Sequence, residues 1–184
     1  MNLTSEEKKQ LIQIALASIH SSVKGEPLPV FEPNTETLRQ LCGAFVTIHK
    51  KGALRGCIGY VEGIKPLHEA VTDMARAAAL EDPRFPPVSA DELDSLDIEI
   101  SVLSPTKRID DVSQIEVGKH GIIIQRGMYK GLLLPQVATE YGWDTTTFLE
   151  HTCQKAGLPT NAWQDDETVI KIFSAIVFGE KDFA

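Results

Sequence analysis

The chain has 184 residues, of which 42% are hydrophobic and 24% are charged, a composition typical of a folded domain with a sizeable core. Its apolar runs all fall short of the roughly 18 residues that a membrane span needs. The 18 Lys and Arg residues against 26 Asp and Glu residues leave a net charge of −8, which argues against a general binder of nucleic acid or anionic membranes. Residues 81–99 contain seven acids and one base, and therefore supply −6 of this charge.

The first half of the chain contains signals for two long helices and a hairpin. Thr4 followed by Glu7 forms a capping box, and apolar residues then recur at helical spacing, which predicts an amphipathic helix over about residues 5–22. A proline-rich extended stretch and a short helix near 35–41 should follow. Strands are expected at 44–49 and 53–60 around a glycine turn. A further helix should begin at Pro66 and end before Pro83.

The second half alternates strands with short helices. Ser89 followed by Glu92 predicts a short capped helix, and residues 96–102 alternate as a strand with Asp97, Glu99 and Ser101 on one face. A hairpin at 121–125 and 129–134 should be buried on both faces. Asp144 can cap a helix that ends at Gly157, and a last strand should cover 169–178. We therefore predict an α+β fold, with a mainly antiparallel sheet and packed helices, in one domain over 1–184.

Cysteines and histidines give no metal signature. Cys42, Cys57 and Cys153 are odd in number and lack the CxxC or Cys/His spacing of a zinc site. His68-Glu69 lacks the second histidine of a zinc-protease helix. We therefore expect no disulfide, no metal and no other cofactor. Because residues 1–9 contain no apolar signal core, we expect a cytoplasmic location in which the thiols stay reduced.

The candidate site is the glycine-rich stretch 52–59. Strand alternation should place Arg55 and Cys57 on one face, and a guanidinium beside a thiol favours the nucleophilic thiolate. Gly56 and Gly59 would allow a ligand or another segment to approach the backbone closely. The alternative is that Cys57 is a small buried hydrophobe and that the glycines relieve crowding between strands. The stretch lacks the features of a P-loop or of a phosphatase loop.

Leu54-Arg55-Gly56-Cys57-Ile58-Gly59 resembles the hallmark motif of the AMMECR family, and the resemblance continues through 82–87, 98–105, 131–138 and 143–158, nearly the whole chain. It implies an α+β fold with a larger and a smaller lobe around a cleft near the Arg-Gly-Cys segment. It implies no established reaction. Stand-alone prokaryotic members resemble protein A of the AmmeMemoRadiSam system, whose other components are a Memo-like protein and a radical SAM protein.

Our leading hypothesis is a cytoplasmic accessory protein or enzyme of that system, which handles a small polar or anionic ligand. In the enzymatic form Cys57 is the nucleophile or acid/base, Arg55 holds its thiolate or the substrate anion, and Arg84 binds substrate together with Gly56 and Gly59. Glu99 would move a proton. Equally, Glu99 could be a solvated acid, and Arg84 could pair with Glu81 or Asp82 across its own loop.

Two rival functions remain open. One is a non-catalytic interaction module for a Memo-like or radical SAM partner. The other is nucleotide or nucleic-acid binding through the basic stretches, which the negative total charge weakens. The enzymatic hypothesis predicts that Cys57 reacts with iodoacetamide faster than Cys153, and that Arg55→Ala slows this reaction.

Overall fold

A computed structural model describes residues 2–183, which form two compact units. Unit 1 spans Met1–Leu103 and Ile176–Ala184, and unit 2 spans Ser104–Ala175. The predicted α+β class is confirmed, because every paired strand described here is antiparallel and helices pack on the strands in both units. Among the described residues, no helix is long and apolar enough to cross a membrane.

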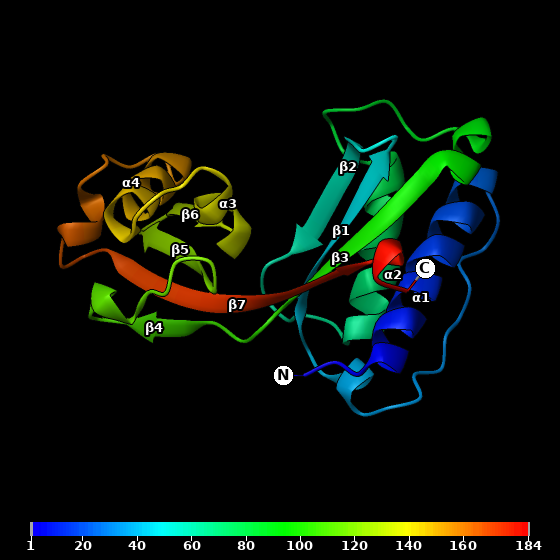
Figure 1. Cartoon of the computed structure of the whole chain (residues 1–184), viewed down its shortest axis with the longest axis horizontal. Coiled ribbons are helices and arrows are strands. Elements are labelled where there is room, and N and C mark those ends of the chain that lie inside the picture. The colour runs from blue at the N-terminus through cyan, green and yellow to red at the C-terminus, as the bar shows by residue number, and fades with distance from the viewer. Residues whose placement is uncertain (1, 184) are drawn as a thin grey trace. The chain divides into compact units, whose positions relative to one another are not determined.

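The elements of unit 1 are α1 (Ser5–Lys24), β1 (Gly43–Lys50), β2 (Ala53–Tyr60), α2 (Leu67–Leu80) and β3 (Leu96–Leu103). Its three strands are neighbours in the order β2-β1-β3, and β7 (Val169–Gly179) follows β3 in the strand order (Figure 1). Short 3₁₀ helices lie at Thr37–Arg39, Ala90–Ser95 and Glu180–Phe183. The predicted hairpin and both predicted helices are therefore present.

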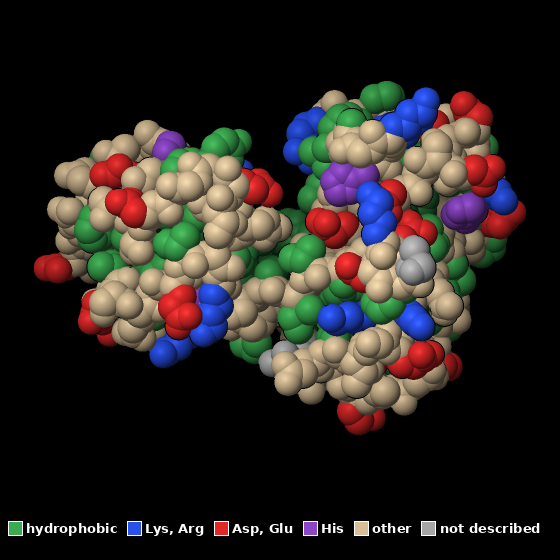
Figure 2. Space-filling view, viewed as in Figure 1, with side chains coloured by type: hydrophobic (Ala, Val, Ile, Leu, Met, Phe, Trp, Pro, Cys, Tyr) green, Lys and Arg blue, Asp and Glu red, His purple; other side chains and the backbone are tan. Residues whose placement is uncertain are grey.

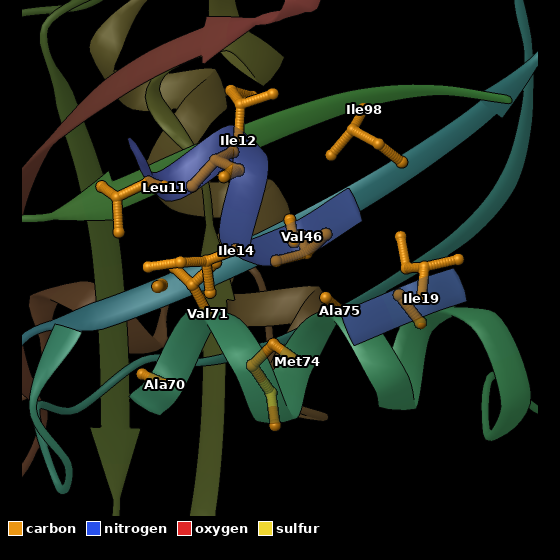
Figure 3. Close-up of a cluster of buried hydrophobic side chains, with 14 of the residues drawn as sticks. Leu11, Ile12, Ile14, Ile19, Val46, Ala70, Val71, Met74, Ala75 and Ile98 are labelled. Carbon is orange, nitrogen blue, oxygen red and sulfur yellow. The ribbon is translucent and has the colours of Figure 1, made fainter. Parts of the chain in front are cut away.

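The core of unit 1 lies between α1, α2 and one face of the sheet. The Thr4 hydroxyl accepts the Glu7 N–H at 3.2 Å, which begins α1 as the capping box predicts. Figure 3 shows side chains of α1 and α2 meeting Val46 of β1 and Ile98 of β3. Because side chains alternate along a strand, the intervening residues lie on the other face, which we call the second face. Its members include Thr47 and His49 of β1, Cys57 and Gly59 of β2, and Asp97 and Glu99 of β3.

A β-bulge interrupts β2. Ile48 of β1 pairs with Gly56, but His49 pairs with Leu54, so Arg55 is an extra residue without a partner. Strict alternation along β2, which was expected to place Arg55 and Cys57 on one face, therefore fails at this point, and the neighbouring Leu54 is 41% exposed. Because of this bulge, Arg55 and Cys57 do not follow the regular alternation of side chains along β2.

Unit 2 has its own core and its own helices. Its strands are β4 (Lys107–Ile109), β5 (His120–Arg126), β6 (Tyr129–Leu133) and β7 (Val169–Gly179), in the order β6-β5-β7 with β4 also paired to β7. Helices α3 (Pro135–Glu140) and α4 (Thr145–Lys155) accompany short 3₁₀ helices at Val112–Gln114 and Ala162–Gln164. The expectation of a hairpin buried on both faces holds for β5 and is wrong for β6, where Tyr129 and Lys130 are exposed.

Candidate functional site

The second face of the unit 1 sheet brings two of the expected site residues into one row. Thr47 is the register partner of Cys57 on β2 and also of Glu99 on β3. The Thr47 hydroxyl donates a hydrogen bond to the Cys57 sulfur at 3.3 Å. Cys57 and Glu99 are therefore separated by two strand spacings, about 10 Å. Cys57 is half-buried, so its thiol is neither fully enclosed nor fully exposed.

A buried carboxylate fixes an arginine beside Cys57. Asp82 accepts the Cys57 backbone N–H at 2.9 Å and the Arg84 side chain at 3.0 Å through Nε and 2.7 Å through Nη2. Arg84 Nη2 also reaches the Cys57 carbonyl oxygen at 3.3 Å. The Arg84 hydrogen bonds, followed by those from the backbone, hold the pKa of Asp82 far below its ordinary value. Asp82 in turn raises the pKa of Arg84.

Arg84 stays accessible although it is held in place. Its side chain is 55% exposed, whereas that of Asp82 is 2% exposed. The Phe85 ring lies 5.5 Å from the guanidinium, a distance at which a cation and an aromatic face attract each other. The sequence-based alternative, in which Arg84 pairs with Asp82 across its own loop, describes this contact correctly. The same contact leaves a guanidinium at the surface next to the Cys57 strand.

Arg55 has a different partner from the expected one. Its Nε and Nη2 donate to Glu92 at 3.1 and 2.9 Å, and Nη1 donates to the Pro86 carbonyl at 2.9 Å. Lys50 also donates to Glu92 at 2.8 Å, and the side chains of Arg55 and Glu92 are each 12% exposed. These contacts join β2 to the 86–92 segment. The cation beside Cys57 is therefore Arg84, and the guanidinium of Arg55 is already satisfied by its own chain.

Other segments of the protein occupy the space beside each glycine of the motif. A Cβ at Gly56 would lie 2.1 Å from the Ala78 carbonyl oxygen of α2. A Cβ at Gly59 would lie 2.3 Å from the Phe45 ring. Because these distances are far below van der Waals contact, each glycine is required for the close approach of another segment. The crowding alternative accounts for both glycines, and a ligand has no room at either position.

Glu99 borders a hollow of about 280 Å³ on unit 1. Figure 2 shows acidic side chains, a histidine and a basic side chain gathered on this unit close to the C-terminal end of the chain. The lining is His49, Gly52, Asp97, Ile98, Glu99, Gly179, Lys181 and Asp182. Sequence reasoning missed His49 and Lys181. His49 alternates with Thr47 along β1 and could have been found, whereas Lys181 comes from the far end of the chain.

The other two cysteines are unlike Cys57. Cys42 and Cys153 are buried, and burial raises the pKa of each thiol. Cys153 lies with Phe148 and Leu149 on the apolar face of α4, so it packs in the core of unit 2. Within residues 2–183, no three His, Cys, Asp or Glu side chains are placed to hold a metal ion.

The fold and the site define a two-unit α+β protein in which a thiol on β2 lies beside an arginine that a buried carboxylate anchors. A family model described as AMMECR1 matches residues 12–178. A protein of Methanothermobacter thermautotrophicus is 46% identical, over 97% of this chain and 96% of its own. The crystal structure of an uncharacterised Pyrococcus horikoshii protein matches with a TM-score of 0.90 and 39% identity, over 97% of this chain and 94% of that chain. The chain therefore belongs to the AMMECR1 family, as its motifs indicate.

Proposed function

We propose that unit 1 binds a small anionic ligand beside Cys57 and that Arg84 is the cationic partner of the ligand. The observation that carries this proposal is a half-exposed guanidinium anchored by a buried carboxylate next to a thiol. Asp82 accepts from the Nε and Nη2 atoms of Arg84, so Nη1 is left to donate to a second anion. An arginine that is already ordered loses less side-chain entropy on binding than a free one.

The charges at this edge of β2 favour an anion. Lys50, Arg55 and Arg84 meet Asp82 and Glu92 here, so three cations face two carboxylates. Both carboxylates are almost buried, with side chains 2% and 12% exposed, whereas the Arg84 side chain projects into water. A ligand that approaches from water therefore meets positive charge first.

Cys57 supplies a reactive group within this site. The thiolate is the nucleophilic form of cysteine. The Thr47 hydroxyl contacts the Cys57 sulfur at 3.3 Å, and Arg84 Nη2 contacts the carbonyl oxygen of the same cysteine at 3.3 Å. The proposal keeps the role of Cys57 as candidate nucleophile and assigns the anion-holding role to Arg84.

The test compares a neutral with an anionic alkylating reagent at Cys57. We expect Arg84→Gln to lower the ratio of the iodoacetate rate to the iodoacetamide rate about fivefold, because one exposed charge contributes roughly 1 kcal/mol. Peptide mapping separates Cys57 from the buried Cys42 and Cys153, which should label slowly in the folded protein. Arg76→Gln is the matched control, because Arg76 is half-exposed on α2 and pairs with Glu81.

Because both reagents alkylate the same thiol, a change in thiol exposure alters both rates alike and cancels in their ratio. An unchanged ratio in Arg84→Gln, with thermal unfolding like that of the unsubstituted protein, would overturn the anion site. Slow labelling of Cys57 by both reagents would instead favour a packing role for this cysteine.

A second candidate, an interaction module within the AmmeMemoRadiSam system, is supported by family membership and by exposed apolar side chains on unit 1. Leu41 and Ile64 are each 60% exposed, and they lie on segments that pack together, because a Cβ at Gly63 would lie 2.5 Å from the Leu41 backbone. We propose a Memo-like or radical SAM protein as the partner. Co-purification and calorimetry at high micromolar concentration test it, with Ile64→Ser expected to weaken binding. If neither partner binds, the module proposal fails.

A further inference from the structure

We propose that the ligand of this site is zwitterionic, with its anionic group on Arg84 and its cationic group in the hollow that Glu99 borders. The inference rests on the proposed function for its anionic half only. The cationic half of the inference rests on the charged side chains of the hollow, and none of these side chains belongs to the anion site.

The hollow carries more negative than positive charge. Its titratable side chains are His49, Asp97, Glu99, Lys181 and Asp182. Three are carboxylates and one is an ammonium group, so the hollow is net negative with histidine neutral. A volume of about 280 Å³ accommodates a small cationic group such as a substituted ammonium.

Two of the three carboxylates already have partners. Asp97 forms a salt bridge with Lys181 at 2.5 Å, and this contact raises the pKa of Lys181, so the ammonium keeps its charge. Asp182 accepts the Gly179 backbone N–H at 2.8 Å, which closes the C-terminal turn. Each of these carboxylates therefore has a structural role within unit 1.

Glu99 is the carboxylate whose charge is not compensated. Among residues 2–183 it has no hydrogen bond or salt bridge of its own, and its interaction with Lys181 is a longer-range one. It is half-buried in β3, so part of its solvation is already lost. A partly desolvated carboxylate that lines a hollow attracts a cation more strongly than one in open water. His49 adds a ring that can accept or donate a hydrogen bond at the same hollow.

A row of side chains across the sheet connects the hollow at Glu99 with the anion site at Arg84. Thr47 lies between Glu99 and Cys57, and Arg84 lies beyond Cys57 at the free edge of β2. The charged ends of a ligand that lies along this row would be about 10 Å or more apart, since neighbouring strands are about 4.8 Å apart. Cys57 would then face the ligand between its charged ends, nearer to the anionic end. The geometry thus favours an extended zwitterion over a simple anion.

Charged methanethiosulfonates that form a disulfide with Cys57 test both ends. The reagents are a trimethylammonium-ethyl, a sulfonato-ethyl and a neutral methyl thiosulfonate, and each releases a sulfinate as the new S–S bond forms. We expect Glu99→Gln to lower the cationic-to-neutral rate ratio two- to fourfold, as Coulomb attraction across about 10 Å of watery surroundings gives. Lys181→Met, which frees Asp97, should raise the same ratio.

Arg84→Gln should lower the anionic-to-neutral ratio and, because it removes a cation, should raise rather than lower the cationic-to-neutral ratio. Glu116→Gln is the matched control for Glu99→Gln, because Glu116 is an exposed acid of unit 2. Both ratios should approach those of a free thiol at 1 M salt, where the screening length is about 3 Å.

The outcomes separate the two proposals. If Arg84→Gln acts on the anionic ratio and Glu99→Gln leaves the cationic ratio unchanged, the anion site stands and the zwitterion is overturned. If Glu99→Gln acts and Arg84→Gln does not, both the anion site and the zwitterion are overturned. Thermal unfolding of each variant identifies a misfolded protein, and Lys181→Met is expected to shift the cationic-to-neutral ratio in the opposite direction from Glu99→Gln.

Discussion

At Gly56 the backbone of β2 meets the backbone of α2. A side-chain Cβ there would lie 2.1 Å from the Ala78 carbonyl oxygen, and helix backbone cannot rotate out of the way as a side chain can. We therefore expect Gly56→Ala to lower the free energy of unfolding by about 3 kcal/mol, the upper part of the range for overpacking. Urea denaturation measures this change.

The control for Gly56→Ala is Gly25→Ala at the end of α1. Gly25 has a φ of 70°, and a Cβ there would meet nothing within 4 Å, so only backbone strain opposes the substitution. That strain costs roughly 1–2 kcal/mol. If Gly56→Ala costs no more than Gly25→Ala, the close packing of β2 on α2 is not what requires the glycine.

The sequence predicts the sheet face of a residue more reliably than it predicts the partners of that residue. The glycine-rich stretch marks Cys57, and alternation correctly places Glu99 on the face opposite the core. The assignment of Arg55 to Cys57 fails because one bulge changes the register of β2. The sequence offers Asp82 as a partner of Arg84 but misses its contact with β2, because that contact joins residues 25 positions apart and no local pattern encodes it.

At the scale of elements, the 81–95 segment is attached to β2 by charged side chains. Within this acidic window, Asp82 and Glu92 are not solvated acids: their side chains are 2% and 12% exposed and hold Arg84 and Arg55. The capping box predicted for Ser89 and Glu92 is present, and the same Glu92 carboxylate also binds Arg55 and Lys50. One residue therefore both begins a short helix and fixes it to the sheet.

We expect Arg55→Ala to destabilise the protein by about 3 kcal/mol at pH 7, because it leaves the nearly buried Glu92 without its main partner. Arg55, then Lys50 and the Ser89 N–H, lower the pKa of Glu92 from its ordinary 4.5. A lowered pKa stabilises the fold above pH 4.5, and this contribution is lost as the pH falls below that value. Urea unfolding between pH 7 and pH 3 should show a weaker pH dependence in Glu92→Gln than in the unsubstituted protein.

Although Arg55→Ala should destabilise the protein, we expect it to leave the anion selectivity of Cys57 labelling unchanged. Arg84 is anchored by Asp82 and by the Cys57 backbone, so Arg55→Ala should leave the iodoacetate-to-iodoacetamide ratio within about twofold of its original value. A fivefold loss in Arg55→Ala would restore Arg55 as the cation of the site. Equal pH dependence in Glu92→Gln would show that Glu92 is not a main source of acid sensitivity.

Helices and long strands follow from the sequence, whereas only some of the short elements do. Predicted bounds of 5–22 for α1 and 169–178 for β7 end within two residues of Ser5–Lys24 and Val169–Gly179. The three-residue β4 and the six-residue α3 are absent from the prediction, because so few residues show no periodicity. β6 is misassigned as buried because apolar Leu and Tyr residues do not reveal which face of a hairpin is covered.

At the scale of the whole molecule, each unit has its own hydrophobic core. The unit 1 core is formed by α1, α2 and the strands β1 and β3, with Leu11, Ile14, Val46 and Ile100 fully buried. The unit 2 core is formed by α4, β5 and β7 around the fully buried Phe148 and Ile122. Two separate cores are the usual mark of segments that can unfold at different denaturant concentrations.

The two tryptophans make this separation measurable. Trp143 and Trp163 both pack against the unit 2 core, so tryptophan fluorescence reports on unit 2, whereas far-UV circular dichroism is dominated by the long helices α1 and α2 of unit 1. We expect Ile14→Ala, which removes a fully buried α1 side chain, to cost about 2–5 kcal/mol in unit 1. The dichroism midpoint in urea should fall while the fluorescence midpoint moves little. Phe148→Ala should do the reverse, and equal shifts of both midpoints in either variant would show that the two cores unfold as one cooperative structure.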